Sequence, residues 1–70
     1  SGRMIAESAD ALTTIYLTSK HRFAVWDERT ASLNDFDTIE DLEDAGVKPA
    51  VLAQVAQSVG APRPVLELDI

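Results

Sequence analysis

The sequence predicts a single small α+β domain, and three of its patterns indicate this fold class. Residues 12–19 and 22–29 are rich in β-branched and aromatic residues whose side chains alternate between two faces, with a short link between them. Two amphipathic helical segments follow, and residues 65–70 alternate again. Strand and helix patterns gathered in separate blocks are typical of α+β proteins. The predicted order is (α)ββααβ: an antiparallel hairpin, an αα-hairpin and a C-terminal strand, with one small layer of sheet packed by two short helices.

The size of the chain limits how stable its core can be. A domain of 70 residues buries only about 60% of the surface that its unfolded chain exposes. The sequence has no cysteine, which excludes disulfides and thiolate metal sites. Small domains commonly gain stability from such links or from a partner chain. Oligomerisation is the support that remains, and we expect a homo-oligomer, with a dimer as its simplest form.

The residues near the N-terminus lack the basic region, apolar run and small-residue cleavage site of a signal peptide, so we expect none here. Residues 1–3 precede Met4 as an expression scar would, so the domain is assigned to residues 4–70 and residues 1–3 are left out of the fold prediction. Residues 4–11 fit a short helix and a turn equally well. No apolar run reaches the roughly 20 residues that span a bilayer. We expect a cytoplasmic protein without membrane association.

Residues 12–19 and 22–29 are predicted to form an antiparallel hairpin. Both segments are rich in β-branched and aromatic residues and alternate with period two. The link around Lys20 and His21 has no glycine or asparagine, so its turn type is left open. Residues 30–37 are predicted as a connection, with a short third strand as the alternative. One face of the hairpin carries Ile15, Leu17, Phe23 and Val25 and is expected to meet the helices, while Tyr16 and Trp26 share the other face.

Two helices are predicted to follow. Asp37 as N-cap, with Glu40 three residues later, forms a capping-box pattern, and Gly46 ends this first helix. Pro49 suits the first turn of the second helix, which Gly60 ends. Residues 65–70 are expected to pair with the hairpin or with another chain. The predicted core comprises Ile15, Leu17, Phe23, Val25, Phe36, Ile39, Leu42, Val51, Leu52, Val55, Val59, Leu66 and Leu68.

An acidic cluster lies in and before the first predicted helix. Like charges spaced four residues apart on a helix repel, and the carboxylates near the C-terminal end gain nothing from the helix dipole. A solvated helix face and a surface for a basic partner both explain such a cluster. Trp26 and Tyr16 are read either as interface anchors or as core residues. The residues predicted to bind a protein partner are Glu40, Asp41, Glu43, Asp44, Trp26 and Tyr16.

Residues 38–57 resemble a helix-turn-helix, with a glycine between two short helices and Val47 after it. The resemblance implies a DNA-binding regulator. The chain departs from the motif at Asp41, where the motif has an apolar residue, and at Leu42, where it has a small one. The net charge of −6 repels phosphate backbones. Nucleic acid is therefore disfavoured as a partner, although the basic turn of Lys20, His21 and Arg22 is a candidate anion contact.

The reactive side chains form no recognisable catalytic pattern. His21 is the only histidine, and no nucleophile, orienting carboxylate or phosphate-binding glycine loop accompanies it. We expect no enzyme activity, no cofactor and no metal site. The first hypothesis is a small acidic protein-interaction module, an accessory, regulatory or inhibitory protein of bacterial or phage origin that docks on a larger partner. A DNA-binding regulator and a self-associating assembly protein are the alternatives.

Overall fold

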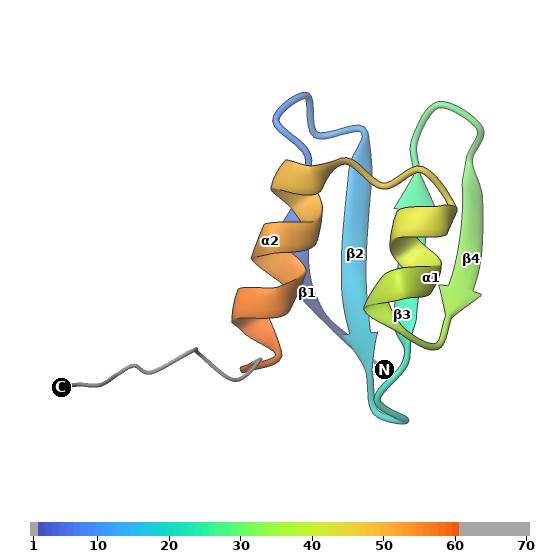
Figure 1. The fold of residues 1–70 in the computed structure, drawn as a ribbon. Coiled ribbons are helices and arrows are strands. Elements are labelled where there is room, and N and C mark those ends of the chain that lie inside the picture. Colours follow the sequence, from blue (N-terminus) through green and yellow to red (C-terminus); the bar gives the residue numbers. More distant parts are fainter. Residues whose placement is uncertain (1, 61–70) are drawn as a thin grey trace, which may run out of the picture.

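A four-stranded antiparallel sheet carries two helices on one face (Figure 1). The computed structural model of the chain describes residues 2–60. The strands lie side by side in the order in which they occur in the chain, so each pairs with the next through a hairpin. The elements are β1 (Gly2–Glu7), β2 (Thr13–Thr18), β3 (Phe23–Asp27), β4 (Ser32–Phe36), α1 (Ile39–Asp44) and α2 (Pro49–Ser58).

The α+β class is confirmed, but the order of elements in residues 2–60 is ββββαα. The segment 4–11, left open between a helix and a turn, is a strand as far as Glu7 and a turn after it. The strand also includes Gly2 and Arg3, which pair with Thr18 and Leu17. Its period-two pattern is hidden because the pairing with β2 shifts between Met4 and Ala6. This bulge allows two consecutive residues, Ile5 and Ala6, to be buried. The C-terminal strand predicted at residues 65–70 lies outside the described residues.

β4 occupies the segment that the sequence favours as a connection. Its central side chains are exposed, so it lacks the apolar alternation by which a half-buried strand is recognised. Pairing with β3 holds it in place, with Trp26 opposite Leu33 and Val25 opposite Asn34. The central β2–β3 hairpin agrees with the prediction, and its register sets Ile15 opposite Val25.

Each of the three hairpin turns contains a residue other than glycine in the left-handed region. These residues are Ala11, His21 and Ala31, with φ of 62°, 61° and 52°. In the β2–β3 turn the Thr18 amide donates to the Arg22 carbonyl at 2.8 Å, and the His21 amide donates to the Thr18 carbonyl at 3.0 Å. A turn of this kind commonly places glycine at the left-handed position. The absence of glycine is why the sequence did not reveal the turn type.

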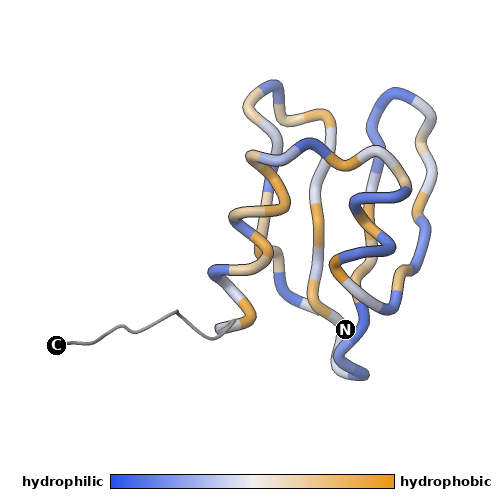
Figure 2. The backbone as a smooth tube through the Cα atoms, in the orientation of Figure 1, coloured by the Kyte–Doolittle hydropathy of each residue, from blue (hydrophilic) through white to orange (hydrophobic). Residues whose placement is uncertain are grey.

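The core lies between the sheet and the helices, and three of its side chains are fully buried: Ile15, Leu42 and Val55. Figure 2 shows apolar residues along α2 and the central strands, the elements that meet in this core. Val59 was predicted to belong to the core but is 37% exposed, because it follows the last turn of α2. The predicted core residues Leu66 and Leu68 lie outside the described residues. The buried core comprises Ile5, Ala6, Ile15, Phe23, Leu42, Val51 and Val55.

The first helix begins one residue later than predicted. Thr38, and not Asp37, is its N-cap: the Thr38 hydroxyl accepts from the Asp41 amide, and the Asp41 carboxylate accepts from the Thr38 amide. This reciprocal pair is a capping box with Asp41 in place of the predicted Glu40. The helix ends as predicted, with Gly46 at φ 95°. The amide of Val47 then reaches back to the Leu42 carbonyl, as in a Schellman motif.

The two helices lie over different halves of the same sheet face. α2 begins with Pro49 as predicted and packs along β1. α1 packs against β4 and α2 (Figure 1). Neither of these helices, among the residues that the structure describes, has the length and apolar character to cross a membrane. The arrangement leaves one sheet face without helices, and it associates each sheet edge with a different helix.

Candidate functional site

Within residues 2–60, no helix or loop element covers the sheet face opposite the helices. We call it the open face. The strand register assigns residues to it, because directly opposed residues in paired strands point to the same side. Met4 and Leu33 are 57% and 60% exposed there, at opposite sides of the sheet. The open face comprises Gly2, Met4, Glu7, Thr14, Tyr16, Thr18, Ala24, Trp26, Leu33 and Asp35.

Tyr16 and Trp26, both predicted as interface residues, lie together on the open face. Each covers a small residue directly opposite: Trp26 covers Thr14, and Tyr16 covers Ala24. The two covered residues are 9% and 8% exposed, although no helix lies over them. The two aromatic rings are themselves half-buried. They therefore form a partly exposed apolar layer rather than part of the main core.

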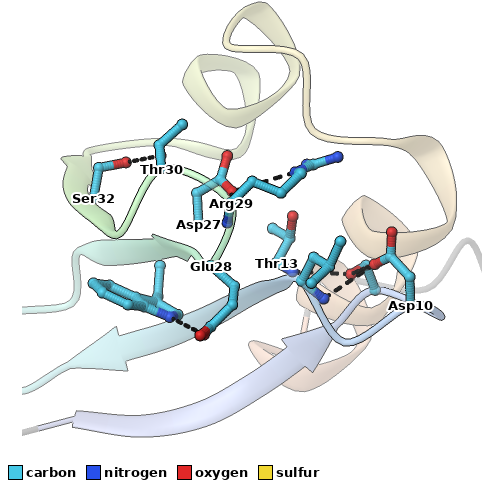
Figure 3. A network of polar contacts seen from close by, with 10 residues as sticks. Asp10, Thr13, Asp27, Glu28, Arg29, Thr30 and Ser32 are labelled. Atoms are coloured by element: carbon cyan, nitrogen blue, oxygen red, sulfur yellow. Dashed lines mark hydrogen bonds and ion pairs between the residues drawn. The ribbon is translucent and has the colours of Figure 1, made fainter.

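Carboxylates surround this apolar layer. The Trp26 indole Nε1 donates to the Glu28 Oε1 at 2.8 Å, which fixes the ring beside a negative charge (Figure 3). Glu7 and Asp35 lie on the same face by register. Among the strand residues that the structure describes, the register places no lysine or arginine on this face. The open face thus has an apolar centre with an acidic rim.

The acidic residues predicted to bind a partner lie on the other side of the sheet, with α1. Glu40, Glu43 and Asp44 are exposed. Asp41 is engaged in the capping box with Thr38, so it has a structural role in the helix. The structure therefore does not place these carboxylates on one face with Trp26. It separates the predicted partner-binding residues into two groups on opposite faces of the sheet.

Both groups nevertheless border β4. α1 packs against this strand, and Trp26 pairs with Leu33 within the sheet. Asp35 lies in the strand, and Asp37 follows it directly. We call this region, formed by β4, α1 and the adjacent Trp26, the β4 side. It combines most of the predicted acidic cluster with the larger of the two aromatic side chains.

The two edges of the sheet differ in how their backbone groups are satisfied. On β1, the side chain of Gln54 in α2 bonds to both backbone groups of Glu7: its Oε1 accepts from the amide at 3.1 Å, and its Nε2 donates to the carbonyl at 2.9 Å. Ser58 donates to the Ile5 carbonyl at 3.0 Å. No sequence pattern indicates this contact, since Gln54 lies outside the apolar stripe of α2. Within residues 2–60, the backbone of β4 has hydrogen bonds to β3 and to nothing else.

The basic turn of Lys20, His21 and Arg22 is exposed except for Arg22, which is half-buried. Arg22 Nη1 lies 3.1 Å from the Asp37 Oδ1. An ion pair this exposed contributes little to stability, but it draws the arginine toward the acidic end of β4. The predicted anion contact is not tested by this geometry.

A groove of about 500 Å³ lies on the helix side, between the β1–β2 turn, the β3–β4 turn and the α1–α2 connection. Four charged residues border it: Asp10, Asp27, Arg29 and Lys48. The Asp10 carboxylate accepts from the Ser8 hydroxyl at 2.6 Å and from the Leu12 amide at 3.1 Å, and these bonds lower its pKa. Asp27 accepts from the Arg29 amide at 2.9 Å (Figure 3). Both carboxylates are thus engaged in holding turns.

The second helix of the resembled helix-turn-helix is packed against the sheet. Its Gln54 and Ser58 side chains bond to the β1 backbone, so they are already engaged on the β1 edge. No group of three or more His, Cys, Asp or Glu side chains suited to a metal ion occurs in the described part of the chain. Comparison with protein-family models, curated proteins and solved structures finds no match to this chain. Its surfaces are therefore the basis for a functional assignment.

Proposed function

We propose that the protein is a small acidic protein-interaction module that docks on a larger partner through its β4 side. The observation that carries the proposal is Leu33, 60% exposed and directly opposite Trp26 on a sheet face with an acidic rim. Apolar centres with polar rims are typical of protein interfaces, and tryptophan is enriched among the residues that dominate binding. Met4 and Tyr16 extend the apolar layer across the face.

Charge selects the kind of partner. The chain has a net charge of −6, and the open face carries Glu7 and Asp35, with Glu28 bonded to Trp26 beside its apolar centre. Complementary charges speed association and favour the correct partner, whereas like charges facing each other oppose it. A larger protein with a basic surface fits this face better than a second copy of the chain does.

Site-specific photo-crosslinking in the source cell tests the proposal. A photoreactive residue replaces the exposed Leu33 in one variant and Gln57, exposed on α2, in the control. Position 33 lies on the β4 side, and position 57 lies on the helix that packs along β1. We expect an adduct of one defined mass from position 33, less of it at high salt, and none from position 57.

Identification of the captured protein completes the test. It should be basic around the cross-linked residue, because the acidic rim requires charge complementarity. Equal adducts from positions 33 and 57 would show non-specific contact and reject the proposal. An adduct consisting only of two copies of this chain would replace the proposed docking with self-association.

A further inference from the structure

The two edges of the sheet differ, and this difference indicates how a partner binds. The inference rests on the proposed function, because it concerns the same partner. We infer that the partner contributes an extended segment that adds to the β4 edge as a fifth strand. The unpaired backbone groups of an edge strand form a template for another strand, and proteins usually block such edges. Here one edge is blocked and the other is not.

The block on β1 is specific. Three hydrogen bonds from Gln54 and Ser58 reach the backbone of Ile5 and Glu7, at 3.1, 2.9 and 3.0 Å. A primary amide that bonds to both backbone groups of one residue imitates the hydrogen bonds of a neighbouring strand. A strand approaching β1 would have to displace these side chains. On β4, within the part of the chain that the structure describes, no side chain or loop bonds to the backbone in this way.

The register of β4 specifies the side chains that an added strand needs. Leu33 and Asp35 lie on the open face, two residues apart, while Asn34 points to the helix side. Residues of an added strand alternate in the same way, and neighbours on one face contact each other. An apolar residue beside Leu33 and a lysine or arginine beside Asp35 would match both. The recognised segment therefore has an apolar and a basic residue two positions apart.

The exposed carboxylates of α1 favour the same partner segment, one that carries a basic residue. α1 packs against β4 with Glu40, Glu43 and Asp44 exposed. A strand added at β4 would present its alternate side chains to the open face and to the side of the sheet that carries α1. One extended segment can thus approach both groups of predicted partner-binding residues, which lie on opposite faces of the sheet.

A second copy of the chain fits the β4 edge less well. If two β4 strands paired antiparallel about Asn34, Asp35 of each copy would lie opposite Leu33 of the other. This pairing sets a carboxylate against an apolar side chain twice and brings together two chains of net charge −6. A basic segment of another protein has neither disadvantage.

A synthetic peptide tests the inference without knowledge of the partner. The probe is a capped heptapeptide with valine at its centre, lysine two residues to either side and threonine elsewhere, so that it fits β4 in either direction. Amide hydrogen exchange and chemical shifts are followed by NMR on the full chain. We expect the probe to slow exchange of outward-facing β4 amides and to leave the β1 amides unchanged.

Two controls separate strand addition from other binding. D35N should weaken the probe about two- to fivefold, the loss of one cross-strand charge pair, whereas Q57K, with the same change in net charge on α2, should not. The probe N-methylated at every residue has no edge that can form backbone pairs and should not bind. Equal binding of the methylated probe, or no change in β4 amides at millimolar probe, would overturn the inference.

Two further results would also reject the inference that a partner segment adds to β4 as a strand. Protection of the β4 amides that grows with protein concentration in the absence of probe would identify a second copy as the occupant. Position 33 could cross-link a basic partner while the β4 amides of that complex exchange as fast as in the free protein. That result would keep the proposed docking on the open face and would reject the addition of a strand to β4. The proposed function and the binding mode therefore fail by different measurements.

Discussion

Gln54 bonds to both backbone groups of Glu7: its amide nitrogen donates to the carbonyl at 2.9 Å, and its oxygen accepts from the amide at 3.1 Å. This contact joins residues 47 positions apart and fastens α2 to the outer edge of the sheet. Glutamate at this position would keep the acceptor but lose the donor. The contact therefore stabilises the fold and blocks the β1 edge at once.

Gln54→Glu should reduce the free energy of unfolding by about 1 kcal/mol, the net value of a typical hydrogen bond. Gln57→Glu is the matched control, because it makes the same change on the same helix at an exposed position, and it should stay within about 0.5 kcal/mol of the parent. Urea unfolding followed by tryptophan fluorescence measures both. Equal effects of the two substitutions would show that Gln54 has no special role.

The hairpin turns offer a second test. Ala11 and Ala31 have φ of 62° and 52°, a region that costs an L-residue energy but costs glycine almost none. Ala11→Gly and Ala31→Gly should each raise the free energy of unfolding by about 0.5 to 1 kcal/mol. Part of the relieved strain is offset by the larger entropy of glycine in the unfolded chain.

Ala53→Gly is the control for these turn variants. Ala53 is exposed within α2, where glycine should lower the free energy of unfolding by about 1 kcal/mol. The same urea titration then gives opposite signs for one chemical change at two kinds of position. A decrease in stability in the turn variants as well would contradict the assigned backbone conformation.

The hairpin and the second helix could be predicted from the sequence because their patterns are local. The strands around Ile15 and Val25 are rich in β-branched and aromatic residues, and Pro49 and Gly60 delimit α2. β1 and β4 could not be predicted in the same way. The bulge at Ile5 breaks the alternation of β1, and β4 has a largely exposed sequence that becomes a strand only because β3 pairs with it.

The candidate site could be predicted only in part, because some of its contacts join residues that are far apart in the sequence. Tyr16 and Trp26 share a face because each strand alternates with period two and the short hairpin sets the register between them. The separation of Trp26 from the α1 carboxylates depends on the face of the sheet over which the helices pack, which is a long-range property. The Gln54 contact with Glu7 depends on the docking of α2 along β1, and no local pattern indicates it.

Asp10 should make the stability of the fold depend on pH. Its bonds to the Ser8 hydroxyl and the Leu12 amide lower its pKa in the folded state. A carboxyl with a lowered folded pKa stabilises the fold above its unfolded pKa, about 3.9, and this contribution is lost as the pH falls through the folded pKa. Asp10→Asn should therefore be less stable than the parent at neutral pH.

The difference between Asp10→Asn and the parent should shrink below about pH 4. Ser8→Ala, which removes the largest cause of the shift, should reproduce part of this effect. Its loss at neutral pH also includes the Thr13 amide, which donates to the Ser8 hydroxyl at 3.0 Å. Urea unfolding at a series of pH values measures both. A constant difference between parent and Asp10→Asn across the series would show that the ionised carboxylate does not stabilise the β1–β2 turn.

The carboxylates of α1 supply the last prediction, which concerns binding. Substitution of Glu40, Glu43 and Asp44 by glutamine or asparagine removes three exposed charges and keeps Asp41, whose capping bond with Thr38 the helix needs. Loss of charges at the edge of an interface mainly slows association and reduces its salt dependence. The triple variant should therefore bind the partner cross-linked at position 33 with a lower association rate and an almost unchanged dissociation rate, as measured by stopped-flow fluorescence.

Trp26→Ala should behave in the opposite way, because it removes an apolar anchor from the centre of the open face. We expect faster dissociation with little change in the salt dependence. Asp41→Ala is the folding control: it removes the oxygen that accepts from the Thr38 amide and should lower the free energy of unfolding by about 1 kcal/mol. If the triple variant binds the partner at the parental rate at low salt, α1 is only a solvated helix face and the partner is selected by the open face alone.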